Sequence, residues 1–362
     1  MKRILITGAG GTPSTNFVRS LRVSSESFHL IGVDCNEYYL HRAETNERYL
    51  VPYADDKDYV PILKGIIQET KPDLIYSQPD QEIYRISKIR DELWAEFGVR
   101  IFLPCHETIE LCQDKLASYL KWRDAGLKVP ETVRINSEQD LRSAFDKFGS
   151  PVWIRAIVSP GGGRGSFRAE NYKAAKAWID FCEGWGNFTA AECLRPNSTT
   201  WMSIWKNGEL IVAQGRKRMY WEFANRAPSG VTGITGTGIT ISDPLVDEVA
   251  LKAITAIDKQ PNGIFSVDLT YDEEDVPNPT EINIGRFFTT HYFFTTAGLN
   301  MPYIFVRLAF DEEIPRILRT INPLTPGLAW IRGMDFLPVL TDEKTIRLYK
   351  EELEERKRNV RK

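Results

Sequence analysis

The stretch Glu281-Ile282-Asn283-Ile284-Gly285-Arg286 carries the strongest indication of fold in this chain of 362 residues. Successive side chains of a β-strand point to opposite faces, so Glu281 and Asn283 share one face and the isoleucines occupy the other. Asp268 stands thirteen residues earlier, in an apolar run that predicts a preceding strand. Two carboxylates and an amide oxygen form an oxygen-only set suited to Mg²⁺ that bridges nucleotide phosphates. We favour this metal site over a solvated strand face, because the opposite face is apolar.

Basic residues flank this acidic strand. Arg286 lies just beyond it, where a cation would neutralise a transferring phosphoryl group. Arg155 ends the apolar run 151–155, and the glycine-rich run 161–165 follows. Glycines let backbone N–H groups approach phosphate oxygens closely, although a surface hairpin has a similar composition. The basic run 216–218 (Arg-Lys-Arg) lies between the glycine run and the acidic strand, an order that suits a triphosphate pocket better than an isolated solvated face.

The order of these features resembles the ATP-grasp superfamily, in particular the branch of the carbamoyl-phosphate synthase large subunit. Asp114-Lys115, which opens a helical stretch, and the run 126–130 (Gly-Leu-Lys-Val-Pro) are similar to that family's entry motif. The run 151–155 and the glycines after it resemble its nucleotide-binding strand and phosphate loop, and this branch has an arginine where Arg155 stands. Residues 191–194 (Ala-Glu-Cys-Leu) are similar to the linker whose backbone binds adenine.

Two positions depart from the family pattern. Glu281, Asn283 and Arg286 match the family's magnesium strand, but one extra residue precedes the arginine. The family's ribose-binding glutamate falls at Thr199, whose hydroxyl is a poorer partner for a ribose diol. This second departure keeps open an alternative, a non-catalytic nucleotide- or ligand-binding protein built on the same fold.

The resemblance implies an α/β chain in which a Rossmann-like pre-ATP-grasp domain precedes a two-lobed ATP-grasp fold with α+β lobes. We expect the first domain at residues 1–112, the small lobe at 113–190, the large lobe with the metal site at 191–320, and a C-terminal extension at 321–362. The implied chemistry is ATP-dependent joining of a carboxylate to an amine through an acyl phosphate. A true carbamoyl-phosphate synthase is not expected, because the duplicated second half of that enzyme is missing.

The resemblance also implies a role for each matching residue. The residues expected to bind the cofactor ATP are Lys115, Arg155, Gly162, Gly163, Arg164, Gly165, Glu192, Cys193, Leu194 and Thr199. The expected Mg²⁺ ligands are Asp268, Glu281 and Asn283, and the residues expected to orient the acyl phosphate are Arg286 and Arg216. Replacing Glu281 by glutamine should remove most turnover and leave the fold intact, because a surface-facing ligand contributes little to the core. Residues 229–238 are expected to form a lid over the substrate.

The first 110 residues independently indicate a doubly wound domain, because short apolar runs alternate with helical patterns. The first run ends in Gly8-Ala9-Gly10-Gly11-Thr12-Pro13 and the second in Asp34. This arrangement leaves an NAD(P)-dependent oxidoreductase as a further alternative. It is disfavoured, since the third glycine of the dinucleotide fingerprint allows close packing of helix on strand and here is Pro13. The loop 8–13 and the stretch 78–82 are better placed to line the substrate end of the site.

Composition restricts the remaining classes. The chain is 42 % hydrophobic and 26 % charged with a net charge of −3, which gives no reason to expect nucleic acid or a membrane surface as a partner. The five cysteines form no CxxC pair, so we expect reduced thiols, and no run approaches the ~20 apolar residues of a membrane span. We therefore expect a cytoplasmic protein with small-molecule carboxylate and amine substrates. A homodimer is the common arrangement for such enzymes.

Overall fold

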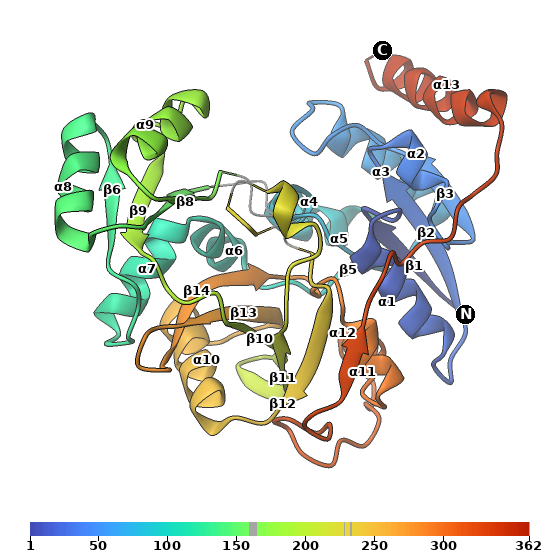
Figure 1. The fold of residues 1–362 in the computed structure, drawn as a ribbon. Helices are drawn as coiled ribbons and strands as arrows, with labels where there is room; N and C mark the ends of the chain where they lie inside the picture. Colours follow the sequence, from blue (N-terminus) through green and yellow to red (C-terminus); the bar gives the residue numbers. More distant parts are fainter. Residues whose placement is uncertain (159–164, 228, 232–233, 362) are drawn as a thin grey trace.

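The computed structural model describes residues 1–158, 165–227, 229–231 and 234–361. Within these residues the backbone forms a parallel sheet of five strands and two further sheets of four and six strands. Figure 1 shows the three sheets arranged around a common centre, with the chain passing from the N-terminal sheet to the four-stranded sheet and then to the six-stranded one. This mixed α/β architecture confirms the expected fold class.

The N-terminal sheet consists of parallel strands in the order β3-β2-β1-β4-β5. Their bounds are β1 Lys2–Thr7, β2 Phe28–Asp34, β3 Glu47–Leu50, β4 Leu74–Tyr76 and β5 Arg100–Ile101. The connecting helices are α1 Thr12–Arg22, α2 Glu37–Leu40, α3 Tyr59–Thr70, α4 Asp80–Lys88 and α5 Arg90–Phe97. The apolar runs of β1 and β2 are buried because helices cover both faces of a parallel sheet. The sheet presents the carboxyl ends of its strands to the centre of the molecule.

The four-stranded sheet has the order β6-β9-β7-β8. Its elements are β6 Thr132–Ile135, β7 Val152–Ala156, β8 Phe167–Ala169 and β9 Phe188–Glu192, with helices α8 Glu138–Phe148 and α9 Tyr172–Phe181. A capping box at Ser137 and Asp140 begins α8, and Asn171 caps α9. The two helices pack on each other and on the sheet, which encloses a separate small core. This unit carries Arg155 on β7 and the linker at the end of β9.

The six-stranded antiparallel sheet has the order β14-β13-β10-β11-β12-β15. Its strands are β10 Ser198–Lys206, β11 Glu209–Arg218, β12 Thr237–Ile241, β13 Gly263–Tyr271, β14 Pro277–Ile284 and β15 Ala329–Ile331. The helices around it are η1 Ala224–Arg226, α10 Pro244–Ile257, α11 Tyr292–Thr296 and α12 Met301–Ala309. Asn207 and Gly208 both have positive φ, as a tight hairpin between β10 and β11 requires. The Asn-Gly pair in the sequence predicts this hairpin, and the structure contains it.

Two segments cross between these units. Helices α6 His106–Gln113 and α7 Lys115–Asp124 pack against α10 and β14, and the indole N–H of Trp122 donates to the carbonyl of Ala253 at 3.0 Å. The buried side chain of Trp122 belongs to a core cluster that also contains residues of α10 and of the large sheet. Consequently the side chain of Lys115 starts from a rigid support beside the large sheet.

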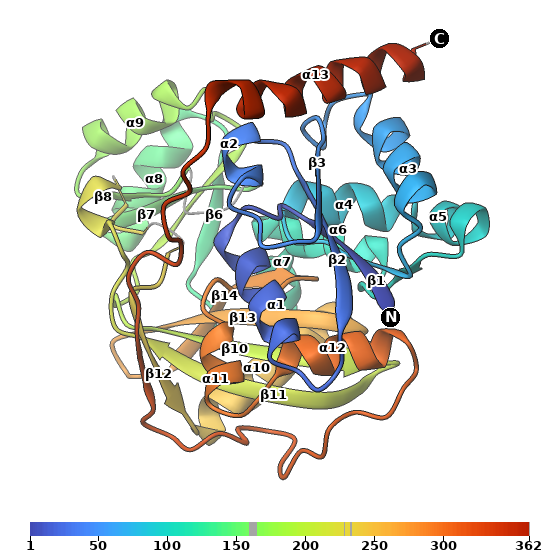
Figure 2. The ribbon, with the colours of Figure 1, turned by 90° about the vertical axis from the view of Figure 1, so that its right-hand side faces the viewer.

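The C-terminal segment is integrated into the fold. Strand β15 extends the large sheet by pairing with β12, and helix α13 Glu343–Val360 then lies across the N-terminal unit (Figure 2). The sequence of this helix is rich in charged residues, and most of it is exposed. Leu353 is buried, and ion pairs to Glu37, Glu69 and Asp58 tie the helix to the N-terminal unit. None of the helices in the described part of the chain is both long and apolar enough to cross a membrane.

Candidate active site

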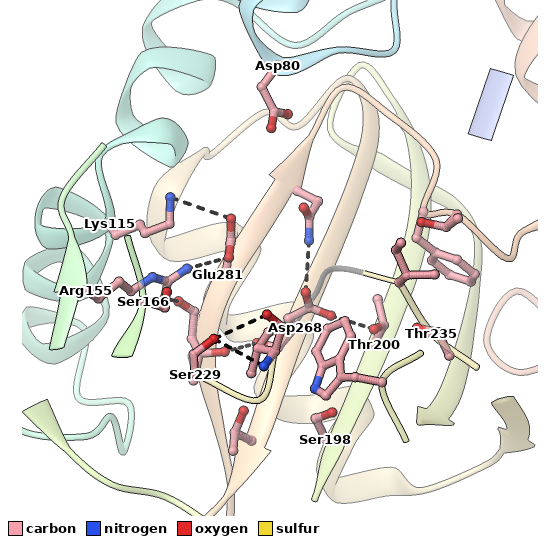
Figure 3. A pocket seen from close by; sticks show the side chains of 18 of the residues that line it. Asp80, Lys115, Arg155, Ser166, Ser198, Thr200, Ser229, Thr235, Asp268 and Glu281 are labelled. Carbon is pink, nitrogen blue, oxygen red and sulfur yellow. Dashed lines mark hydrogen bonds and ion pairs between the residues drawn. The ribbon is translucent and has the colours of Figure 1, made fainter. Parts of the chain in front are cut away.

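A cavity of about 970 Å³ lies where the three units meet. Its walls come from the carboxyl end of the N-terminal sheet, from the linker after β9 and from one face of the large sheet. Figure 3 shows Lys115 and Arg155 pointing toward Glu281 from one side, Asp268 on the neighbouring strand, and Asp80 above them. Residues far apart in the sequence therefore converge on one space.

The register of the large sheet places the expected metal ligands side by side. Asp268 on β13 is directly opposite Glu281 on β14, and Asn283 lies two residues further along the same face. One oxygen of Asp268 accepts from the hydroxyl of Thr200 at 2.5 Å and the other from the amide of Asn283 at 3.0 Å. The alternation argument from the sequence thus describes the actual arrangement of these three side chains.

These three residues fit a magnesium ion. Among the described residues, no group of three or more His, Cys, Asp or Glu side chains is placed to hold a metal ion, so a closed protein cage is absent there. Mg²⁺ does not need one, because it commonly uses one or two carboxylates together with waters and substrate phosphates. Asp268 and Glu281 supply the carboxylates, and the amide oxygen of Asn283 completes an oxygen-only set. When bound, the ion would neutralise charge that develops on the phosphates.

Glu281 lies within a group of cations. Arg155 on β7 donates to its carboxylate and to the carbonyl of Thr280, and the amine of Lys115 lies 3.7 Å from its other oxygen. Burial by itself would raise the pKa of Glu281, but Lys115, Arg155 and Arg286 outweigh burial and lower it to about 2. Burial lowers the pKa of Lys115. Glu281 is therefore negatively charged at neutral pH and forms ion pairs with Lys115 and Arg155.

Arg286 reaches the same site despite the extra residue before it. Gly285 has φ of +72°, a conformation that only glycine adopts without strain, and it ends β14 with a sharp turn. The turn brings the guanidinium back to the amide oxygen of Asn283 at 2.6 Å and to the carboxylate of Asp80 at 2.5 Å. The turn at Gly285 therefore directs Arg286 into the site although one extra residue precedes it. Asp80, at the start of α4, joins the N-terminal unit to the sheet face that carries Asn283.

Alternation along β11 separates the basic run into two faces. Arg216 and Arg218 are buried and line the cavity, whereas Lys217 points outward and is exposed. Arg216 donates to the hydroxyls of Thr235, Thr290 and Thr200 at 3.0, 2.8 and 2.7 Å. Burial, followed by the neighbouring charge of Arg218, lowers the pKa of Arg216 to about 9. It remains charged at neutral pH.

The expected nucleotide residues have different outcomes. Glu192, Cys193 and Leu194 all line the cavity, at the end of β9 where the linker was expected. Thr199 does not line it: its side chain is buried beside the hydroxyl of Tyr271, on the opposite face of β10. The neighbours that face the cavity are Ser198 and Thr200, so the position of Thr199 gives no support to its assignment to a ribose. Gly162, Gly163 and Arg164 lie outside the described residues, while Gly165 is described with φ of +77°.

The N-terminal end of the cavity is acidic. Asp34, at the end of β2, accepts from the backbone N–H groups of Gly10 and Asn36, both at 2.9 Å. One oxygen holds the glycine loop to the second strand and the other holds the turn that follows the strand, a use that competes with the ribose contact of a dinucleotide-binding acid. Gly10 is needed because a Cβ at this position would come within 1.9 Å of the carbonyl oxygen of Tyr39. This packing gives no support to the NAD(P) alternative.

Glu82 predicts a pH dependence of stability. It is buried, lines the cavity and accepts from the hydroxyl of Tyr59 at 2.8 Å, and burial raises its pKa to about 7. A raised acid pKa contributes stability below the unfolded value of about 4.5, and that stability is lost as the pH rises through about 7. We expect Glu82→Gln to gain up to about 3 kcal/mol relative to the wild type between pH 5 and pH 8.

Thermal unfolding at both pH values measures this difference. The exposed Glu352 on α13 offers a matched control, since Glu352→Gln should show the same shift at pH 5 and pH 8. A Glu82→Gln shift that is equally independent of pH would mean that the carboxyl group titrates normally.

No known family model matches the sequence, but solved structures share the fold. An N5-carboxyaminoimidazole synthetase from Staphylococcus aureus, complexed with ADP, has 18 % identity and a TM-score of 0.66, over 87 % of this chain and 78 % of that one. A biotin carboxylase from Campylobacter jejuni, as a β,γ-ATP complex, has 16 % identity and a TM-score of 0.66, over 87 % and 72 %. An L-amino acid ligase from Bacillus licheniformis has 13 % identity and a TM-score of 0.64, over 85 % and 74 %.

These three proteins are ATP-grasp enzymes. The chain has the ATP-grasp fold. One fold supports many chemistries, so the reaction has to be argued from the residues of the cavity. Thr200 and Trp221 were not singled out from the sequence, and Arg218 and Thr235 entered only as members of the basic run and of the expected lid. The period-two pattern of β11, which puts Arg218 on the same face as Arg216, is the one signal that would have found any of them.

Proposed function

We propose that this ATP-grasp protein is an ATP-dependent carboxylate–amine ligase that works through an acyl phosphate. The observation that carries the proposal is the side-by-side placement of Asp268, Glu281 and Asn283 on one sheet face. Two cations that lie outside this sheet, Lys115 on α7 and Arg155 on β7, approach the same carboxylate. A carboxylate shared by two basic groups from different elements is the arrangement that a nucleotide triphosphate with its magnesium ion would exploit.

The residues divide the work by position. A metal ion held by Glu281 would leave Lys115 and Arg155 free to pair with phosphate oxygens. The linker residues 192–194 then face the nucleoside from the end of β9. A carboxylate oxygen of the substrate attacks the γ-phosphorus, the bond to the bridging oxygen breaks, and ADP leaves. Arg286 and Arg216 supply the positive charge that holds the reacting groups and offsets the charge that develops.

The second step joins the amine. Its nitrogen attacks the carbonyl carbon of the acyl phosphate, and the bond between that carbon and the phosphate oxygen breaks. Inorganic phosphate leaves, and the nitrogen gives up a proton. Since all three units of the protein line one cavity, the acyl phosphate would form in a space that excludes much of the bulk water.

Thermal unfolding in the presence of nucleotides tests the proposal. A ligand that binds only the native state raises the melting temperature by an amount that grows with its concentration over Kd. We expect ATP with Mg²⁺ to raise it by several degrees, ATP without Mg²⁺ to raise it less, and NADH to have no effect. Release of ADP that depends on an added carboxylate should follow. A magnesium-dependent shift without ADP release from any carboxylate and amine would indicate the non-catalytic alternative.

A further inference from the structure

Two buried arginines form a group at the opposite side of Asp268 from Lys115 and Arg155. Figure 3 shows Thr200 and Thr235, which hold these arginines, on that side of the pocket. Arg216 is only 1 % exposed, and its side chain donates to three threonine hydroxyls and to no carboxylate. Its Nε–H has no hydrogen-bond partner among the described residues. A buried cation with an unused donor is costly unless an anion completes it.

Arg218 is buried beside Arg216 and also bonds to hydroxyl groups. It donates to Thr235 at 3.0 Å and to Ser198 at 2.6 Å, and it forms an ion pair with Asp268 at 3.5 Å. If Asp268 ligates a metal ion, that negative charge is shared with the ion. Two adjacent guanidinium groups are then left without an anion of their own.

The hydroxyls around the arginines are placed to donate. Thr235 accepts from both Arg216 and Arg218, so its lone pairs are engaged and its own proton is left to donate elsewhere. Thr200 differs, because its proton goes to Asp268. Ser198 accepts from Arg218 and lines the cavity, so its proton also remains to donate. These polarised hydroxyls and the Nε–H of Arg216 make a receptor for an oxyanion.

The walls beside this receptor are apolar. The ring of Phe288 covers the Arg216 guanidinium at 4.5 Å and the ring of Trp221 covers that of Arg218 at 3.5 Å. Val231 and Ile234 also line this end. Among the described cavity residues within 221–235 and 288–289, none carries a charge. An oxyanion shared by Arg216 and Arg218 leaves the rest of the ligand against these apolar rings and side chains.

We propose that this end of the cavity binds the acceptor, and that the acceptor is a monocarboxylic acid with an apolar side group. The inference rests on the proposed ligase function and names its substrate class. The carboxylate of the acceptor lies between the two arginines and the expected metal ligands on β13 and β14. The apolar group lies against Trp221, Val231 and Phe288. A second carboxylate or a phosphate ester on the acceptor would meet those apolar walls unpaired.

Hydroxylamine trapping tests the substrate class without knowledge of the natural amine. Hydroxylamine attacks the carbonyl carbon of an acyl phosphate, releases phosphate and leaves a hydroxamate that can be measured. The probes are isovalerate, 3-phenylpropionate, succinate and 3-phosphoglycerate, each with ATP and Mg²⁺. We expect at least about tenfold higher kcat/KM for the two apolar acids, since even one methylene in an apolar pocket changes it by about 10–200-fold. Equal values, or higher values for the other two acids, would overturn the inference.

A substitution that adds a cation to the apolar wall should change the preference. Val231→Lys is expected to raise the ratio of succinate to isovalerate use by at least about tenfold, while Trp221→Ala should lower use of 3-phenylpropionate more than use of isovalerate. Met219→Ala is the matched control, because Met219 is exposed on the same segment and lies outside the cavity wall. An unchanged ratio in Val231→Lys that folds as the wild type would also count against the inference.

These outcomes distinguish a failure of the proposed acceptor class from a failure of the proposed ligase function. Hydroxamate formed only from succinate or 3-phosphoglycerate would remove the apolar acceptor and leave the ligase function standing. A magnesium-dependent ATP shift with neither hydroxamate nor a further shift from any of the four acids would show that the arginine pair does not receive a carboxylate. The absence of any ATP shift would remove the ligase function itself, and the inference with it.

Discussion

Glu281→Gln is expected to lose more than about 100-fold of its ATP turnover. Glutamine keeps the shape of the side chain but not its charge, and a direct metal ligand should matter more than the outer partners of a metal site, whose loss costs about 10–100-fold. The variant should also lose most of the magnesium dependence of ATP binding. Steady-state ADP release and the magnesium-dependent thermal shift measure the two effects separately.

The ion pairs of Glu281 add a loss of stability to the expectation that the fold stays intact. Glu281 pairs with Arg155 and Lys115, and its pKa is lowered to about 2. A lowered acid pKa contributes stability that is present above the unfolded value of about 4.5 and is lost as the pH falls through about 2. With 27 % of its side chain exposed, Glu281 should contribute at most about 3 kcal/mol at pH 7. We therefore expect a lower melting temperature in the ligand-free variant as well.

Glu274 provides the matched control for this prediction. It lies in the turn between β13 and β14, pairs with Lys128 and is 78 % exposed, so Glu274→Gln removes one charge from the same hairpin without touching the cavity. Its turnover should stay within about twofold of the wild type, as surface substitutions usually do little. Near-normal turnover in Glu281→Gln would mean that this strand does not hold the metal ion.

The sequence predicted those elements whose own residues specify them. Strands β1 and β2 are short apolar runs followed by helices, β10 and β11 are joined by Asn207-Gly208, and all of these are present in the structure. Strand β12 was missed because residues 229–238 are rich in glycine and threonine, a composition typical of a loop. Thr237–Ile241 forms a strand because β11 and β15 supply backbone partners on both sides. Such pairing depends on distant segments, so local propensity does not reveal it.

The same distinction explains the site. Alternation within β14 was sufficient to put Glu281 and Asn283 on one face, and the metal assignment based on it stays a prediction. The position of Thr199 required the register of β10, and an error of one residue moves a side chain to the other face. The direction of Arg286 depends on the positive φ of Gly285 and on Asp80, more than two hundred residues away. Contacts of this kind come from the tertiary fold alone.

Arg216→Met is expected to lower kcat/KM for the acceptor by more than about 100-fold while leaving the magnesium-dependent ATP shift within about a degree of the wild type. Removing one charged donor from a preorganised oxyanion site commonly costs about 100–1,000-fold. Arg216 hydrogen bonds to Thr200, which in turn donates to Asp268, but Arg216 itself does not contact the metal-binding carboxylates. The loss should therefore fall on acceptor use rather than on nucleotide binding.

The melting temperature provides a second, independent test of the Arg216→Met variant. Burial and the charge of Arg218 lower the pKa of Arg216 to about 9, so the charged form is held in the folded protein at a cost, and its three hydrogen bonds offset only part of it. We expect Arg216→Met to melt at the same temperature as the wild type or slightly higher. Lys217→Met is the control, because Lys217 is the exposed neighbour on the opposite face of β11, and it should leave acceptor kinetics unchanged. If the ATP shift disappears together with activity in Arg216→Met, the arginine serves the triphosphate, and the order of subsites along the sheet has to be reversed.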